Sequence, residues 1–296
     1  MNNENITPTV AYLGPEASFT HVAATALFGL SGLVPQPTIP DCIEAVAKGH
    51  VAYAIVPIEN ALEGSVPMTI DYLFHESELF INAAISIPIE QHLMVNEKQA
   101  AHLQDIDSIN SHPHALAQCH KYLKNHYRRV PLIQTTSTAA AAKYISENPN
   151  ERIAAIGNRM AAEKYGLHIA EENIHDFHFN HTRFLIISLR QECLVKEGHS
   201  EKRKTTLMVE LPQDDQSGVL HQILSVFAWR KLNLSKIESR PLKTGLGNYF
   251  FIIDVLESDD HPMMQGAKEE LAALDCSIRS FGSYYTYEQT PSRHTK

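Results

Sequence analysis

The chain has 296 residues, enough for two domains of ordinary size, and 44% of its residues are hydrophobic against 20% charged. This balance excludes a disordered or fibrous protein, because such chains lack the apolar residues that form a core. Lys and Arg number 25 against 34 Asp and Glu, giving a formal net charge of -9. We therefore expect no nucleic-acid partner, since phosphate binding needs clustered basic surface.

No segment of the sequence predicts export or membrane insertion. Residues 1–8 are polar and lack the basic start and apolar core of a secretory signal. Uncharged apolar runs such as 184–189 fall far short of the roughly 20 residues of a membrane helix. The cysteines lie far apart, at Cys42, Cys119, Cys193 and Cys276. This spacing indicates reduced thiols in the cytoplasm, with neither a zinc site nor a disulfide framework.

In the first 190 residues, short apolar runs alternate with helix-like apolar spacing. We expect strands at 10–13, 53–58, 106–111, 132–135, 153–156 and 184–189, and helices at 17–28, 41–49, 115–126 and 138–146. Strands that alternate with helices predict an α/β architecture with mostly parallel pairing. The region is interpreted as one domain or as two lobes around a cleft.

A charged stretch interrupts this pattern and a new pattern follows it. Residues 191–204, QECLVKEGHSEKRK, predict a solvated linker. We then expect strands at 205–211, 234–239, 249–256 and 277–284, helices at 217–231 and 266–274, and a turn at 243–247. The order βαββαβ is that of a ferredoxin-like unit. Because so small a sheet has one bare face and open edges, we expect it to pair with a second copy.

Polar clusters flank the expected strands, where ligands gather in open α/β sheets. They occupy residues 14–20, 57–65, 111–119, 135–138 and 180–184. Each cluster alone is typical of a helix cap or turn, whereas all five together favour a ligand cleft. The hydroxyl groups at 135–138 precede an expected helix and suit an anion. The sequence has no G-x-G-x-x-G or Walker pattern, so a nucleotide is not indicated.

Closely spaced histidines raise a metal site as an alternative: His112, His114 and His120, and then His175, His178 and His181. Metal sites in enzymes generally add carboxylates or hydrogen-bond partners that orient the ligands. The sequence contains no H-E-x-x-H pattern, and some close spacings are expected among 17 histidines. We therefore expect no metal. A serine nucleophile is not favoured either, because the sequence has no G-x-S-x-G motif.

These segments together resemble the prephenate dehydratase family. The resemblance runs through AYLGPEASFTHVAA at 11–24, VPIENALEGSV at 56–66, SHPHALAQC at 111–119, TTSTAAAA at 135–142 and NHTRFLII at 180–187. The C-terminal part is similar to the ACT regulatory domain of this family, with SGVLHQIL at 217–224 and KIESRPLKTGLGNYFFIID at 236–254.

The resemblance implies a two-lobed catalytic domain at 1–190 like a type II periplasmic binding protein, a linker at 191–204 and a ferredoxin-like ACT domain at 205–296. It implies a lyase that converts prephenate to phenylpyruvate in phenylalanine biosynthesis, losing water and carbon dioxide without a cofactor. Because the first catalytic strand begins near residue 10, we expect no N-terminal chorismate mutase domain of the kind some members carry.

The catalytic positions of the family fall on polar side chains, namely Asn60, Ser111, Gln118, Thr182 and Arg183. The resemblance gives Thr182 the central catalytic role. Three further positions in matching motifs are implied to bind substrate: Glu59, Ser137 and Thr138. The chain departs from the family pattern at Ala61, where Ser is usual, at Ala17-Ser18, where Gly-Thr is usual, and at His114, which replaces a common Gln.

The residue types suggest separate roles for Thr182 and Arg183. The planar guanidinium of Arg183 can pair with a substrate carboxylate through two hydrogen bonds. A neutral alcohol is a poor general acid near pH 7, so we expect Thr182 to stabilise the departing hydroxide as a hydrogen-bond donor. On this basis Thr182→Val lowers kcat, whereas Arg183→Leu raises KM.

The resemblance to ACT domains implies that L-phenylalanine acts as an allosteric inhibitor at a subunit interface. The implied binding residues are Gly218, Val219, Leu220, Glu238, Ser239, Arg240 and Pro241. Gly218 permits close backbone approach, and the helix start after it can receive a carboxylate. We expect a homodimer or homotetramer formed through these domains.

Two other functions remain open at this stage. Arogenate dehydratase performs the same chemistry on the aminated substrate, and no residue decides between the two substrates. A non-catalytic amino-acid sensor is the second alternative, because both halves resemble ligand-binding folds. The Thr182-Arg183-Phe184 motif together with Asn60 and Gln118 argues against a sensor.

Overall fold

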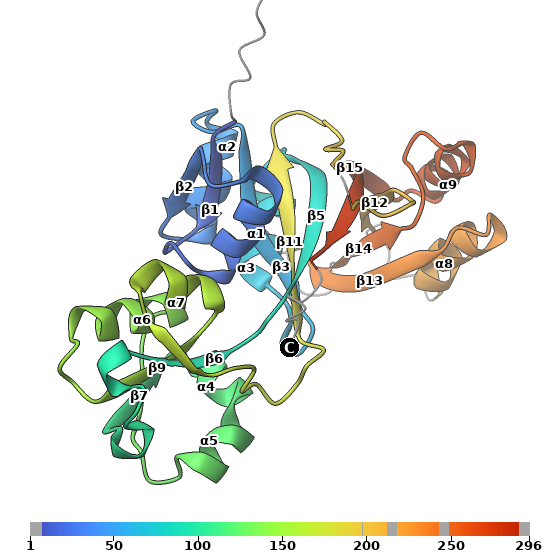
Figure 1. Cartoon of the computed structure of the whole chain (residues 1–296). Helices are drawn as coiled ribbons and strands as arrows, with labels where there is room; N and C mark the ends of the chain where they lie inside the picture. The colour runs from blue at the N-terminus through green and yellow to red at the C-terminus, as the bar shows by residue number, and fades with distance from the viewer. Residues whose placement is uncertain (1–7, 197, 212–217, 243–248, 290–296) are drawn as a thin grey trace, which may run out of the picture.

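The computed structural model describes residues 8–196, 198–211, 218–242 and 249–289. They form three parts that lie side by side in Figure 1: lobe 1 in blue, lobe 2 in green and a C-terminal unit in orange and red. Lobe 1 contains β1 (Val10–Leu13), α1 (Phe19–Phe28), β2 (Leu33–Gln36), α2 (Ile39–Ala47), β3 (Tyr53–Asn60), β4 (Gly64–Ser65), α3 (Pro67–His75), β5 (Phe80–Pro88) and β11 (His181–Ser188).

Lobe 2 is inserted into lobe 1, because the chain leaves through β5 and returns through β11. Its elements are β6 (His92–Val95), β7 (Ser108–Ser111), α4 (Pro113–Gln118), α5 (His120–His126), β8 (Leu132–Gln134), α6 (Thr138–Glu147), β9 (Ile153–Gly157), α7 (Arg159–Tyr165) and β10 (His168–Glu171), with short 3-10 turns at Glu97–Gln99 and Leu103–Asp105. The sheet order is β10-β6-β9-β7-β8. The expected two-lobed α/β architecture is thus confirmed.

Strand pairing within the lobes is mixed, so the expectation of mostly parallel pairing is wrong. β1 pairs in parallel with β2 and β3, and β7 pairs in parallel with β8 and β9. β11, which returns the chain to lobe 1, is antiparallel to β3 and β5. β6, the first strand of lobe 2, is antiparallel to β9 and β10. Each crossing reverses the chain direction, which the sequence pattern alone did not indicate.

The C-terminal unit has the predicted βαββαβ order. It consists of β12 (Lys204–Glu210), α8 (Val219–Trp229), β13 (Leu234–Pro241), β14 (Tyr249–Val255), α9 (Pro262–Ala273) and β15 (Ser277–Glu288). After Gly282, whose φ is 101°, β15 continues into lobe 1, where Tyr285–Glu288 pair in parallel with residues 83–86 of β5. The two sheets are therefore one continuous sheet in the order β13-β14-β12-β15-β5-β11-β3-β1-β2.

The face of the C-terminal sheet that the sequence suggested would be bare is covered by lobe 1. One hydrophobic core contains Phe74 of α3 together with Phe250, Phe281 and Tyr284 of the C-terminal unit. The rings of Phe74 and Phe281 lie 4.3 Å apart. The opposite face packs against α8 and α9 through residues such as Ile223. Because both faces are covered within one chain, a bare face no longer argues for pairing with a second copy.

Several predicted boundaries differ from the structure. The expected helix at 115–126 breaks at Cys119, where α4 ends and α5 begins. Strands β2, β5, β6 and β10 were not predicted, and β15 extends to Glu288. The expected turn at 243–247 and the first residues of the expected helix at 217–231 lie outside the described residues. All four cysteines are free.

The predicted linker at 191–204 lies along lobe 1 and makes specific contacts. The Leu194 backbone N–H donates to the Asn82 carbonyl at 3.2 Å. The Tyr287 hydroxyl donates to the Leu194 carbonyl at 2.8 Å and accepts from the Lys196 N–H. Lys204 already belongs to β12 and is buried. Among the residues described here, no helix is both long and apolar enough to span a membrane.

Candidate active site

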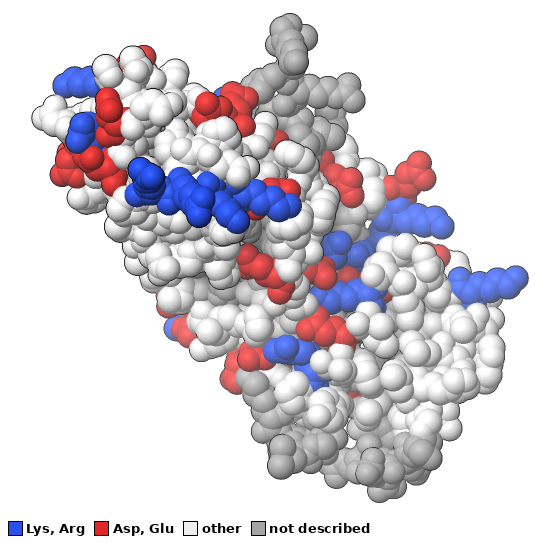
Figure 2. Space-filling model, turned by 90° about the horizontal axis from the view of Figure 1, so that it is seen from below, with Lys and Arg blue, Asp and Glu red and all other residues white. Residues whose placement is uncertain are grey.

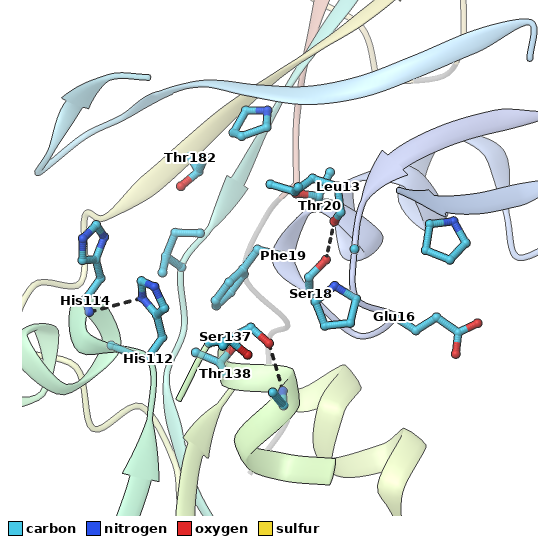
Figure 3. Close-up of a pocket in the computed structure, with 18 of the residues that line it drawn as sticks. Leu13, Glu16, Ser18, Phe19, Thr20, His112, His114, Ser137, Thr138 and Thr182 are labelled. Carbon is cyan, nitrogen blue, oxygen red and sulfur yellow. Dashed lines mark hydrogen bonds between the residues drawn. The ribbon is translucent and has the colours of Figure 1, made fainter. Parts of the chain in front are cut away.

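A cleft of about 980 Å³ lies between lobe 1 and lobe 2. Figure 3 shows that its polar side chains come from both sides, with Thr182 on one wall and His112, His114, Ser137 and Thr138 on the other. Of the eight predicted catalytic and substrate-binding residues, five line this cleft: Asn60, Gln118, Ser137, Thr138 and Thr182. The cleft therefore brings together most, but not all, of the predicted set.

Thr182 and Asn60 form the central pair of the cleft. They face each other on the neighbouring strands β11 and β3. Asn60 Nδ2 donates to Thr182 Oγ1 at 2.9 Å and to Asn180 Oδ1 at 3.0 Å. Because Thr182 Oγ1 accepts this hydrogen bond, its own proton is available to a ligand in the cleft. Asn60 Oδ1 in turn accepts from the N–H groups of Leu62 and Glu63, which fixes the amide orientation.

A chain of polar side chains crosses the cleft from lobe 1 to lobe 2. Glu63 of lobe 1 pairs with His114 Nδ1 at 2.8 Å and accepts from Gln118 Nε2 at 3.4 Å. Gln118 Oε1 accepts from Gln91 Nε2 at 3.2 Å, and Gln91 is nearly fully buried. Glu63 and Gln91 line the cleft but were not singled out from the sequence. Glu63 lies in the same VPIENALEGSV segment as Asn60, and this segment could have indicated it as a site residue. Gln91 lies outside all of the segments that resemble the family.

The first residues of α6 form the lobe 2 wall opposite Thr182 (Figure 3). Ser137 caps this helix, since its Oγ accepts from the Ala140 N–H at 3.0 Å. The remaining free N–H groups and the Thr138 hydroxyl face a site where the helix dipole favours negative charge. Among the described lining residues, Lys143 is the only Lys or Arg. The cleft is thus lined by apolar and neutral polar side chains, with Glu16 and Glu63 as the carboxylates among its described lining residues.

Two histidines lie at the start of α4 on the cleft wall. His112 is the N-cap residue of α4, and its Nδ1 accepts from the His114 backbone N–H at 3.3 Å. Burial, followed by the nearby His114 imidazole, lowers the pKa of His112 below 6.5. The imidazole of His112 is therefore neutral at pH 7, as the accepted hydrogen bond also requires.

The loop after β1 contacts lobe 2 directly. Ser18 Oγ donates to the Leu13 carbonyl at 3.0 Å, and Ala17 has a φ of 64°. This left-handed conformation costs little for glycine, the residue that the family pattern has at position 17. Asn158 Nδ2 donates to the Ala17 carbonyl at 2.9 Å, and Lys164 forms an ion pair with Glu16. These contacts hold the two lobes together at one end of the cleft.

Arg183 is not among the described residues that line the cleft, contrary to the carboxylate-binding role inferred from sequence. Side chains alternate along a strand, so Thr182 and Arg183 lie on opposite faces of β11. Arg183 Nη1 pairs with Glu59 Oε2 at 3.0 Å, and both residues line a separate cavity of about 20 Å³ between lobe 1 and the C-terminal unit. Glu59 likewise faces away from the cleft, because it is the residue before Asn60 on β3.

Ser111 lies behind the cleft wall and is fully buried. Its Oγ donates to the Ile156 carbonyl at 2.7 Å, which ties the end of β7 to β9. The side chain therefore holds the strand end from which α4 begins instead of lining the cleft.

The residues predicted to bind phenylalanine divide between two faces of β13. Glu238 and Arg240 point toward lobe 1, where Glu238 accepts from Ser65 at 2.5 Å and Arg240 pairs with Asp71 at 3.4 Å. Ser239 and Pro241 alternate with them and are exposed. On α8, Gly218 is the N-cap residue with a φ of 92°, followed by Val219 and the exposed Leu220.

No group of three His, Cys, Asp or Glu side chains within the described residues could hold a metal ion. The closely spaced histidines instead contact one another as rings. His175 and His178 lie 5.0 Å apart, and His112 and His114 lie 4.9 Å apart. His175 Nδ1 also accepts from the Gln91 N–H at 3.3 Å.

The fold and the cleft define a two-lobed protein with a hydroxyl donor in a cleft large enough for a small molecule. The sequence model of the prephenate dehydratase family matches residues 10–192. A prephenate dehydratase from Bacillus subtilis is 51% identical over 282 residues, which span 94% of this chain and 99% of that protein. The chain belongs to the prephenate dehydratase family.

Solved structures with the same architecture include one prephenate dehydratase and one protein described differently. The crystal structure of prephenate dehydratase from Arthrobacter aurescens in complex with L-Phe matches with a TM-score of 0.81 and 34% identity, covering 93% of this chain and 89% of that one. A protein described as a novel type of quorum quenching acylase also matches with a TM-score of 0.81, at 27% identity, over 97% of this chain and 100% of that one.

Proposed function

We propose that this chain is a lyase that converts prephenate to phenylpyruvate in the cytoplasm, as a step of L-phenylalanine biosynthesis. The observation that carries the proposal is the Asn60–Thr182 pair, which places a hydroxyl proton in the cleft between the two lobes. The membership of the chain in the prephenate dehydratase family supports the same activity.

In the proposed reaction, the bond between the ring and its carboxylate carbon breaks and carbon dioxide leaves. The released electron pair completes the aromatic ring as the ring carbon–oxygen bond breaks and hydroxide departs. Thr182 donates a hydrogen bond to the departing oxygen, while Asn60 keeps the Thr182 lone pair occupied. The hydroxide takes one proton from solvent water that enters the open cleft, and it leaves as water. Stabilisation of developing charge matters more here than proton transfer, because an alcohol is a weak acid at neutral pH.

The carboxylates of the substrate need partners other than Arg183. The start of α6 supplies free N–H groups and the hydroxyls of Ser137 and Thr138, and Gln118 supplies an amide on the same lobe. Neutral donors suit this reaction, because a strong cation on the departing carboxylate would hold it as an anion and oppose the loss of carbon dioxide. We assign substrate binding to these groups. Ser111, Glu59 and Arg183 support the walls of the cleft from behind.

We also assign a regulatory role to residues 205–296 as an ACT domain, with 1–190 as the catalytic domain and 191–204 as the connection between them. The related Arthrobacter aurescens enzyme is in complex with L-Phe, which supports L-phenylalanine as the allosteric inhibitor. The exposed Ser239 and Pro241, with Gly218, Val219 and Leu220 at the start of α8, are the groups available to it. Feedback requires that phenylalanine bind one conformation more tightly than the other, and we propose a homodimer or homotetramer.

The test is formation of phenylpyruvate from prephenate by the purified protein, with and without L-phenylalanine. Turnover that phenylalanine suppresses supports both parts of the proposal. Turnover of arogenate but not prephenate changes the substrate and keeps the chemistry. Hydrolysis of an acyl amide without turnover of either acid would favour the activity of the acylase neighbour, and binding of an amino acid without any turnover would favour a sensor.

A further inference from the structure

A lysine of the C-terminal unit reaches the charged pair behind the catalytic threonine. Lys236 Nζ on β13 lies 3.6 Å from Glu59 Oε1, while Glu59 Oε2 lies 3.0 Å from Arg183 Nη1. Lys236 also donates to Ser65 Oγ at 3.1 Å, and its side chain is only 14% exposed. Acidic and basic side chains lie next to one another in the centre of the face shown in Figure 2. Lys236 thus completes a charge row from β13 through β3 to β11.

This row lies directly behind the central pair of the cleft. On β3 and β11, Asn60 is the register partner of Thr182, and Glu59 is the register partner of Arg183. The two cross-strand pairs are consecutive and point to opposite faces. The register shifts between Arg183 and Phe184, so the ladder is irregular at this point. A change in the Glu59–Arg183 pair therefore acts on the same short stretch of backbone that orients Thr182.

We propose that Lys236 is a positioning residue for the dehydration, acting on Thr182 through Glu59 and Arg183. The proposal rests on the function assigned to the cleft above. The polar partners of Lys236 within the described part of the chain, Ser65, Glu59 and Glu238, lie outside the lining of the cleft. Lys236 fixes the orientation of the Glu59 carboxylate, whose second oxygen is directed at Arg183. Without the lysine, Glu59 loses its ion pair with Lys236, and the Glu59–Arg183 pair is free to adopt other rotamers.

Lys236 also connects the catalytic lobe to the strand proposed to respond to phenylalanine. Its Nζ lies 3.1 Å from Glu238 Oε2, and the same Glu238 oxygen accepts from Ser65. The lysine is therefore shared by a carboxylate of β3 and a carboxylate of β13. A ligand that shifts β13 changes the distances from Lys236 Nζ to the carboxylates of Glu59 and Glu238. This sharing gives the phenylalanine signal a physical route to Thr182.

The first test compares Lys236→Met with Lys236→Arg and with the matched control Arg279→Gln. Arg279 also crosses the boundary between the C-terminal unit and lobe 1, but it donates to the Ser77 carbonyl at the end of α3. We expect Lys236→Met to lower kcat about 3- to 10-fold with KM changed less than twofold. Lys236→Arg restores most of kcat, and Arg279→Gln stays within twofold of the parent protein. Equal losses in Lys236→Met and Arg279→Gln, or a loss confined to KM, would overturn the proposal.

A double-mutant cycle with Glu59→Gln separates positioning from general loss of stability. If Lys236 acts through Glu59, the double variant has the kcat of Glu59→Gln alone; independent, multiplying effects would refute the route. Thermal unfolding of each variant checks that it is folded at the assay temperature. If Lys236→Met does not fold, Lys236→Gln replaces it in the cycle, because this variant removes the charge while keeping a donor for Ser65.

Calorimetric binding of L-phenylalanine distinguishes this inference from the proposed regulation. We expect Lys236→Met to bind phenylalanine with an affinity near that of the parent protein and to be inhibited less by it. Full inhibition at the parent's concentration dependence would overturn the coupling role of Lys236 while leaving regulation intact. Absence of phenylalanine binding in the parent protein would instead remove the regulatory function itself, and the kcat measurements would still decide the positioning role.

Discussion

The two faces of β11 differ in chemistry although their residues are neighbours in sequence. On the cleft face, Thr182 meets the neutral amide of Asn60. On the opposite face, Arg183 meets the carboxylate of Glu59 and, beyond it, Lys236 of the C-terminal unit. A Thr-Arg motif is therefore not one functional unit. One residue faces the cleft, and the next faces the boundary with the C-terminal unit.

The separation of the two faces explains how a reaction that expels carbon dioxide can occur near Arg183. A guanidinium in the cleft would stabilise the substrate carboxylate before the reaction more than during it. Because side chains alternate between the two faces of a strand, the guanidinium of Arg183 lies on the opposite face of the sheet from the cleft. There its ion pair with Glu59 fixes the backbone of β11. The following variants test the division between the two faces.

The largest effect is expected from Thr182→Val on the cleft face. Loss of a hydrogen bond made mainly in the transition state should lower kcat about 100- to 1000-fold with little change in KM. Steady-state kinetics with prephenate measure both constants, and Thr182→Ser, which keeps the hydroxyl, is the matched control. A kcat close to that of the parent protein would remove Thr182 from the mechanism.

A smaller effect on the same face is expected from Asn60→Asp. The carboxylate can accept but not donate, so Thr182 would turn its proton toward residue 60 and away from the ligand. We expect kcat to fall about 10- to 100-fold. An unchanged kcat in a folded Asn60→Asp protein would show that the orientation of the Thr182 hydroxyl is unimportant.

On the opposite face, Arg183→Leu should change kcat and leave KM near its parent value. This expectation replaces the rise in KM inferred from sequence, because Arg183 is placed outside the lining of the cleft. We expect a kcat about 3- to 10-fold lower and a loss of stability of no more than about 1 kcal/mol, since both charged side chains are about one third exposed. A tenfold rise in KM with normal kcat would return Arg183 to the substrate site.

The smallest effect concerns His112, a lining residue of the cleft that is neutral at pH 7. Its pKa is lowered in the folded protein, so the unfolded chain takes up a proton at a higher pH than the folded one. Stability should therefore decrease as the pH falls below about 6.5. In His112→Asn, which keeps a good N-cap residue without this titration, thermal unfolding between pH 7.5 and 5 should depend less on pH. An identical pH dependence in both proteins would contradict the assignment.

The residue pattern was sufficient to predict an α/β architecture and the βαββαβ order, and the family resemblance gave five of the residues that line the cleft. The sequence did not predict that Arg183 faces away from the cleft. The strand was expected to begin at residue 184, whereas β11 begins at His181, so Thr182 and Arg183 alternate between its two faces. The strand at Phe80–Pro88 was missed, although its apolar run resembles those of the predicted buried strands. The broken helix at Cys119 and the buried Gln91 depend on contacts with distant segments, which local patterns do not record.

The continuation of β15 into lobe 1 has a consequence for what can be cut from this protein. Removing residues 205–296 would take away Tyr285–Glu288, which occupy the outer edge of β5, and would uncover Phe74 on α3. The remainder would present unpaired backbone groups beside a newly exposed aromatic surface, a combination that promotes aggregation. The C-terminal unit therefore also keeps lobe 1 soluble, and the two should melt in a single cooperative transition.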